Sequence, residues 1–209
     1  MKKVIIPAII AKTQKEFNEK INNVKNHVSL IQLDVMDGKF VENKSIDFNF
    51  KLPKTKCKYE AHLMIKNPEA WIKKHHKKVD TVLIHYQSTK NLPNALNLAK
   101  DKKLKVGIAL NPEVKVSKIE PYLDYIDQVL ILTVHPGAYG AKFLPKNLEK
   151  VKRLRKLKPK LNIEVDGGIS PKTIKQVSKA GTNLFISGSY IVNAESVPKA
   201  LKTLNSSMK

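Results

Sequence analysis

The chain has little cysteine, little arginine and no long apolar run, and each shortage excludes a class of protein. Cys57 is the only cysteine among 209 residues, which excludes an internal disulfide and a zinc site built from several cysteines. No apolar stretch approaches the ~20 residues that a membrane-spanning helix needs. The N-terminal apolar run is interrupted by Pro7 and ended by Lys12, so we predict a buried strand there, not a signal peptide, and a cytoplasmic protein without a membrane partner.

Acidic residues are also scarce, with 18 Asp and Glu against 39 Lys and Arg and a formal net charge of +21. Such a surplus is compatible with nucleic-acid binding. The lysines, however, are spread over the whole chain, and arginine, the better reader of phosphates and bases, occurs only at Arg153 and Arg155. We therefore expect a lysine-rich solvated surface that attracts a small anionic substrate such as a sugar phosphate, and keep a nucleic-acid binder as the least favoured alternative.

Short apolar runs typical of strands alternate with amphipathic stretches typical of helices along the whole chain. The expected strands are 4–6, 28–35, 58–63, 81–85, 105–110, 128–134, 162–165 and 183–187. The expected helices are 13–25, 68–77, 92–102, 114–120, 146–156, 171–179 and 197–204, with a weak helical piece at 47–52 and a frayed tail at 205–209. Eight β-α units predict an α/β protein whose residues 1–209 form a single (β/α)8 TIM-barrel domain. A doubly wound open sheet fits less well, because no Gly-x-Gly-x-x-Gly follows the first strand.

Polar residues end three of the apolar strands, where the strands of a barrel open to one mouth. Asp34 ends the second predicted strand, His62 the third and Asp166 the seventh. A buried charge costs several kcal/mol unless it is paired or ligated, so we expect these three residues to pair with one another or to bind a ligand. Two carboxylates across one mouth suit a reaction in which one removes a proton and the other returns it, with His62 as a metal ligand or acid/base. We expect His85 and His135 to line the same mouth.

Glycines follow the last three predicted strands. They are Gly137 and Gly140, then Gly167 and Gly168, then Gly188 with Ser189. Loops after strands seven and eight usually bind phosphate in this fold through backbone N–H groups, and glycine lets the backbone approach closely. These positions predict a phosphorylated substrate.

Five motifs resemble, in order and spacing, those of ribulose-phosphate 3-epimerases over nearly the whole chain. They are 33–41 (Leu-Asp-Val-Met-Asp-Gly-Lys-Phe-Val), 61–68 (from Ala-His-Leu-Met-Ile to Asn-Pro), 134–137 (Val-His-Pro-Gly), 165–168 (Val-Asp-Gly-Gly) and 187–189 (Ser-Gly-Ser). The resemblance implies a barrel of the ribulose-phosphate-binding type that interconverts D-ribulose 5-phosphate and D-xylulose 5-phosphate. It also implies that Asp34 and Asp166 are the two acid/bases at C3.

The resemblance further implies a divalent metal (Zn, Fe, Mn or Co) held by two histidines and these two aspartates. Asp34, His62 and Asp166 match three of the ligands, and Gln32 stands at the position of the second histidine. A glutamine carbonyl is a weaker ligand for zinc-like ions than imidazole. Weak binding, a harder ion and a metal-free site therefore all stay open.

Other departures from the family pattern concern the residues expected to line the substrate. Alanine replaces the two family serines after the first strand, and His135 replaces an asparagine. Of three methionines expected beside the reacting carbons, Met36 and Met64 are present and Leu132 replaces the third.

Two alternative functions stay open at this point. In these alternatives, the protein is either an epimerase of another ketose phosphate or a catalytically impaired sugar-phosphate-binding protein. The related hexulose-phosphate synthases and decarboxylases are disfavoured, because Met36 occupies the lysine position of their Asp-x-Lys-x-x-Asp motif. The sequence also leaves open whether the protein forms a homo-oligomer.

Overall fold

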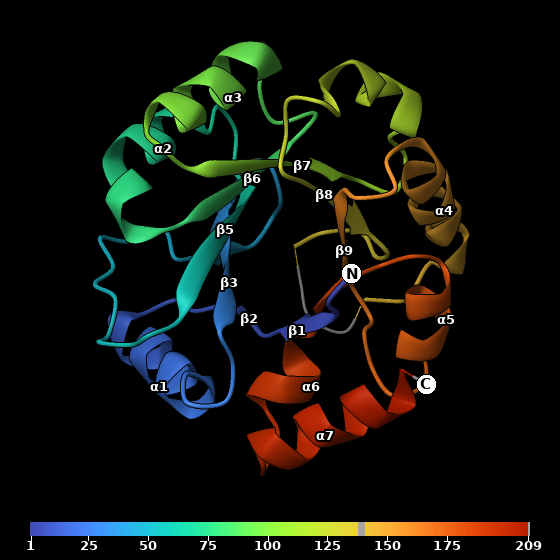
Figure 1. The fold of residues 1–209 in the computed structure, drawn as a ribbon. Helices are drawn as coiled ribbons and strands as arrows, with labels where there is room; N and C mark the ends of the chain where they lie inside the picture. The colour runs from blue at the N-terminus through green and yellow to red at the C-terminus, as the bar shows by residue number, and fades with distance from the viewer. Residues whose placement is uncertain (138–140, 209) are drawn as a thin grey trace.

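A computed structural model describes residues 1–137 and 141–208, and its strands form one curved sheet surrounded by helices (Figure 1). The strands are β1 (Val4–Ile6), β2 (Ala8–Ile9), β3 (Leu30–Asp37), β4 (Lys44–Ser45), β5 (Lys58–Met64), β6 (Thr81–His85), β7 (Lys105–Leu110), β8 (Gln128–Leu132), β9 (Asn162–Asp166) and β10 (Leu184–Ile186). Their order is β1-β10-β9-β8-β7-β6-β5-β3-β2, parallel throughout, and only the short β4 pairs antiparallel, with β3.

The first strand closes the barrel in two pieces. Pro7 separates β1 from β2, since proline has no N–H to offer to a ladder. β1 pairs with β10 and β2 pairs with β3, while the carbonyl of Pro7 accepts a 2.9 Å hydrogen bond from the N–H of Gln32. The two ends of the sheet therefore meet within one strand, which confirms the predicted TIM barrel.

The helices lie outside the sheet. They are α1 (Gln14–Val24), α2 (Glu69–His75), α3 (Leu92–Asp101), α4 (Leu148–Leu157), α5 (Ile174–Lys179), α6 (Ser189–Val192) and α7 (Val197–Ser207). Thr13 caps the N-terminus of α1, because its Oγ1 accepts a hydrogen bond from the N–H of Glu16. Within residues 1–137 and 141–208, no helix is both long and apolar enough to cross a bilayer.

The sequence-based helix predictions fail at three places. Residues 47–52 form no helix, because Phe50 is buried against Phe17 with ring centroids 5.5 Å apart and the chain stays irregular up to Pro53. The predicted helix at 114–120 is reduced to 3-10 turns at Val116–Lys118 and Glu120–Tyr122. The tail is not frayed from residue 205, because α7 continues to Ser207.

The barrel interior combines an apolar lining with a layer of buried amides and carboxyls. The apolar lining consists of Ile6, Ala8, Leu83, Ala109, Leu130, Leu132, Leu184 and Ile186. In the polar layer, Gln128 Nε2 donates to Glu60 Oε2 at 3.1 Å and to Glu164 Oε2 at 2.8 Å. Burial raises the pKa of both glutamates, which favours their neutral, hydrogen-bonding form.

Outside the barrel, His75 on α2 is buried against Phe50 and Trp71. Burial and two nearby lysines lower the pKa of His75 to about 4.

This lowered pKa predicts how stability depends on pH. The unfolded chain binds more protons than the folded protein between the ordinary pKa of histidine and pH 4, so the free energy of unfolding should fall as pH falls through this range. After allowance for screening by nearby water, we expect His75 to contribute about 1–2 kcal/mol to this loss. Urea titrations should show a smaller loss for His75→Phe; an equal loss would contradict the assignment.

Candidate active site

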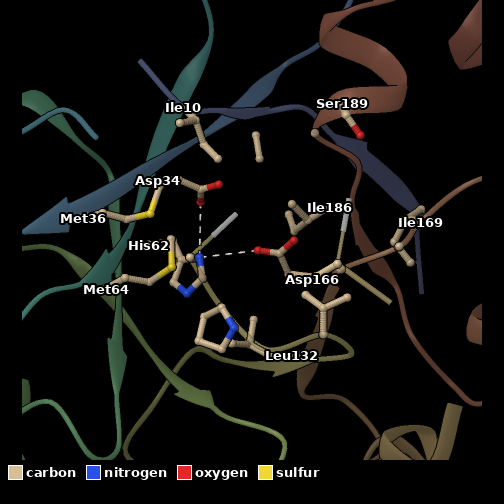
Figure 2. Close-up of a pocket in the computed structure, with 18 residues that line it drawn as sticks. Ile10, Asp34, Met36, His62, Met64, Leu132, Asp166, Ile169, Ile186 and Ser189 are labelled. Atoms are coloured by element: carbon tan, nitrogen blue, oxygen red, sulfur yellow. Dashed lines mark hydrogen bonds and ion pairs between the residues drawn. The ribbon is translucent and has the colours of Figure 1, made fainter. Parts of the chain in front are cut away.

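Three strands bring Asp34, His62 and Asp166 together at one end of the barrel. Asp34 on β3 and His62 on β5 are direct partners in the parallel ladder, and Asp166 ends β9. His62 Nδ1 lies 3.2 Å from Asp34 Oδ1 and 3.4 Å from Asp166 Oδ2 (Figure 2). The imidazole thus stands between two carboxylates that come from separate parts of the sheet.

The pKa values follow from this crowding of buried charge. Burial raises the pKa of Asp34, the charge of Asp166 adds to the rise, and hydrogen bonds from His62 and Gln32 only partly oppose it. Burial alone would lower the pKa of His62, but hydrogen bonds and the charges of Asp166 and Asp34 outweigh it and raise the pKa to about 9. Without a bound cation, His62 is therefore protonated on both ring nitrogens at neutral pH, and its Nδ1–H lies between the two carboxylates.

Gln32 lies next to the same carboxylates but is fully buried and does not line the cavity. Its Nε2 donates to Asp34 Oδ1 at 2.8 Å and to Asp166 Oδ2 at 3.2 Å. Its Oε1 is buried without a hydrogen-bond partner. The amide nitrogen of Gln32 therefore contacts both carboxylates, and the amide oxygen is a buried acceptor without a hydrogen-bond donor.

The cavity above these groups is lined by charged, apolar and glycine residues. The residues around it, from the barrel strands and the loops that follow them, are Ala8, Ile10, Asp34, Met36, His62, Met64, Leu132, Val134, Pro136, Gly137, Ala141, Asp166, Gly167, Gly168, Ile169, Ile186, Gly188 and Ser189. Asp34, His62 and Asp166 are its charged residues, and Figure 2 shows Met36, Met64 and Leu132 beside them. The glycines and Ser189 line the same cavity, and Gly167 directly follows Asp166 in the chain. No lysine or arginine occurs among the described residues of this lining.

The glycine loop after β9 has a backbone that other residues would strain. Gly167 has φ +112° and Gly168 has φ +68°, both in the left-handed region that favours glycine. A Cβ on Gly167 would lie 2.5 Å from Val134 Cγ2, and a Cβ on Gly168 would lie 3.0 Å from Phe143 Cβ. The sequence therefore needs glycine here to bring the backbone close to the cavity.

Most of the residues predicted from sequence border this cavity, with three exceptions besides His85. Gln32 lies beneath it, and Gly140 falls outside the described residues. The structure places His135 away from the cavity, because Val134 points inward and the next side chain along the chain points outward. The His135 side chain is 70% exposed and pairs with Glu113, with Nδ1 and Oε1 3.1 Å apart.

His85 was expected at the mouth but is fully buried behind His62. Sequence reasoning also missed Glu60 and Glu164 as parts of the buried polar layer. Both stand two residues before a site residue on its strand, as Gln32 does. Because alternate residues of a strand share a face, that spacing was the signal that could have identified them.

Comparison with known proteins agrees with this geometry. The family model described as the ribulose-phosphate 3 epimerase family matches residues 4–192. The chain is 32% identical to ribulose-phosphate 3-epimerase of Schizosaccharomyces pombe, with 98% of this chain and 93% of that protein covered. It is 33% identical to ribulose-phosphate 3-epimerase of Bacillus subtilis, with 97% and 98% covered.

Solved structures with lower identity share the fold. The crystal structure of KGPDC from Streptococcus mutans has a TM-score of 0.73 at 17% identity and covers 100% of this chain and 98% of its own. That of 3-hexulose-6-phosphate synthase from Salmonella typhimurium has a TM-score of 0.70 at 15% identity, with 98% of both chains covered. With the family match over nearly its whole length, this chain belongs to the ribulose-phosphate 3-epimerase family and is an enzyme of the isomerase class.

Proposed function

We propose that the protein interconverts D-ribulose 5-phosphate and D-xylulose 5-phosphate by moving protons at C3. The observation that carries the proposal is the pair of carboxylates, Asp34 and Asp166, that face one another across His62 at the floor of the cavity. Inversion at carbon needs a base on one face and an acid on the other. The names of the family relatives support this substrate, and the site offers the two groups.

The two carboxylates take different roles in each direction of the reaction. One takes the C3 proton as a base, and the other, in its protonated form, delivers a proton to the opposite face. The raised pKa of Asp34 helps both directions, because a carboxyl with a pKa closer to neutral is a stronger base when ionised and is more readily protonated. Met36, Met64 and Leu132 surround these groups with apolar side chains that exclude water from the reacting carbon.

A divalent cation fits the donor set of this site. Ligand atoms of Asp34, His62 and Asp166 all lie within 4.8 Å of one another. Gln32 supplies a fourth donor if its amide makes a half-turn, which exchanges Nε2 and the unpartnered Oε1 without changing the shape of the side chain. A bound cation would supply Lewis-acid stabilisation of the negative charge that develops on the substrate oxygens. Three oxygen donors and one nitrogen make a harder ligand set than one with two histidines, which reduces the advantage in affinity of Zn²⁺ over Mn²⁺ or Fe²⁺.

Backbone N–H groups hold the phosphate in this proposal. Since the described lining residues include no lysine or arginine, the anion has to be bound by the main chain of the glycine loops and by Ser189. The glycines and Ser189 line the same cavity as the carboxylates, so a phosphate bound there leaves the sugar chain in the space that Asp34 and Asp166 border. The +21 net charge would steer the anion toward the protein from a distance.

Ser189 tests the phosphate end separately from the chemistry. We expect Ser189→Asp to raise KM for the sugar phosphate by about 10- to 100-fold, because it adds a negative charge beside the phosphate. kcat should change much less. Ser189→Ala is the matched control and should stay within a few-fold of the wild type. Equal KM values for the two variants would place the phosphate elsewhere.

The proposed reaction is tested by converting D-ribulose 5-phosphate with the purified protein, with and without a chelator, beside a six-carbon ketose phosphate. We expect conversion of the pentose phosphate that the chelator suppresses and added Mn²⁺ restores. Preference for the six-carbon substrate would favour another ketose-phosphate epimerase. Binding without turnover under any added metal would favour a sugar-phosphate-binding protein. The cytoplasmic location stays a prediction.

A further inference from the structure

His85 lies directly behind the candidate metal ligand His62. The two ring centroids lie 4.9 Å apart with 20° between the ring planes, and the two Nε2 atoms point toward one another at 2.8 Å. A ring nitrogen either donates or accepts, so this distance requires one Nε2 to carry a proton and the other to be bare. The direction of this single hydrogen bond decides whether His62 Nδ1, which faces Asp34 and Asp166, can be free of a proton in the neutral ring and so bind a cation.

The surroundings of His85 hold its ring in one place. Its backbone carbonyl accepts from the N–H of Ser88 at 3.0 Å and from Ser88 Oγ at 2.9 Å, which ends β6. The Phe40 ring covers it, with ring centroids 4.7 Å apart. With its backbone held by Ser88, the side chain cannot rotate away without losing the ring contacts with Phe40 and His62.

Two buried polar atoms indicate which tautomer the ring adopts. His85 Nδ1 and Asn111 Oδ1 are both buried without a partner at regular hydrogen-bond geometry. Asn111 still lies close enough to favour the charged form of His85, although burial and the charge of His62 lower the pKa of His85 well below its usual value. A proton on Nδ1 directed at Asn111 Oδ1 would satisfy both atoms, and it leaves Nε2 of the neutral ring as an acceptor.

We propose that His85 is a positioning residue that accepts a hydrogen bond from His62 Nε2–H and so presents His62 Nδ1 to the cation held with Asp34 and Asp166. The proposal rests on the function proposed above, because it takes His62 as a ligand. Histidine ligands commonly donate their second N–H to a fixed acceptor, which sets the tautomer and the ring orientation. Here the acceptor is a second imidazole, itself oriented by Asn111.

The first test reads the tautomer in the metal-free wild-type protein. Long-range ¹H–¹⁵N spectra distinguish a proton on Nδ1 of His85 from one on Nε2. We expect the proton on Nδ1. A proton on Nε2 would overturn the proposal, because His85 would then donate to His62. This measurement does not depend on metal binding or turnover.

The second test measures Mn²⁺ affinity by calorimetry. His85→Leu should weaken binding by about 10- to 100-fold, because His62 loses its acceptor. His85→Gln, whose carbonyl can accept the same bond, should restore most of the affinity. His75→Leu, at a buried histidine outside the barrel, is the matched control and should bind as the wild type does. Wild-type affinity in His85→Leu, or no recovery in His85→Gln, would overturn the role of His85. Failure of the wild type to bind Mn²⁺ would refute the metal site of the proposed function and leave the tautomer to decide the role of His85.

Discussion

Replacing Asp34 or Asp166 with asparagine should lower turnover of D-ribulose 5-phosphate by about 10²- to 10⁴-fold, the usual contribution of a general acid or base. Asparagine keeps the shape of aspartate but can neither take nor deliver the C3 proton. Each variant should lose the reaction in both directions, because the group that acts as base in one direction acts as acid in the other. Steady-state kinetics from each epimer measure this loss.

The fold should survive the change. Burial raises the pKa of Asp34, so a neutral amide at that position removes an unfavourable buried charge. The same change removes one partner of the protonated His62, so the two effects oppose one another and we expect Asp34→Asn to stay folded with little change in melting temperature. Asp47→Asn, at an exposed aspartate 3.6 Å from Lys44, is the control and should keep full activity. Wild-type turnover in either site variant would show that the two-base assignment is wrong.

Replacing Gln32 with histidine should tighten Mn²⁺ or Zn²⁺ binding by about 10-fold or more, because imidazole is a stronger ligand than an amide oxygen for these ions. The gain should be larger for Zn²⁺ than for Mn²⁺, since the amide oxygen is the harder donor. Calorimetry of the metal-free protein measures both affinities without reference to activity.

Gln32→Leu gives the opposite test at the same position. Leucine fills a similar volume but has no ligand atom and leaves both carboxylates without the amide donor. It should bind metal more weakly than the wild type. If Gln32→His and Gln32→Leu bind both metals as the wild type does, Gln32 does not contact the cation.

The barrel and the core of the site could be predicted from sequence because they depend on local patterns. Apolar runs ending in Asp34, His62 or Asp166 identify both the strand and its inward-facing end, and the parallel ladder then brings these ends together. Gly167 and Gly168 could likewise be identified from residue type as a loop that lets the backbone approach closely, and both have positive φ values. The role of each residue in the reaction stays a prediction.

What sequence reasoning missed depends on long-range packing. The segment around Phe50 looked weakly helical, but the ring is drawn into the core by Phe17 and Trp71. His135 continues a strand-like pattern, yet its side chain points outward to Glu113. The contact of His85 with His62 requires the register between β5 and β6, which no local pattern reveals.

The most direct measurement is a single turnover of D-ribulose 5-phosphate in D₂O with excess enzyme. If Asp34 and Asp166 act from opposite faces, the proton delivered to C3 comes from a carboxyl group that has exchanged with solvent. The D-xylulose 5-phosphate formed should then carry deuterium at C3. Product that retains protium at C3 would show that a single group removes and returns the same proton, and would contradict the two-carboxylate account.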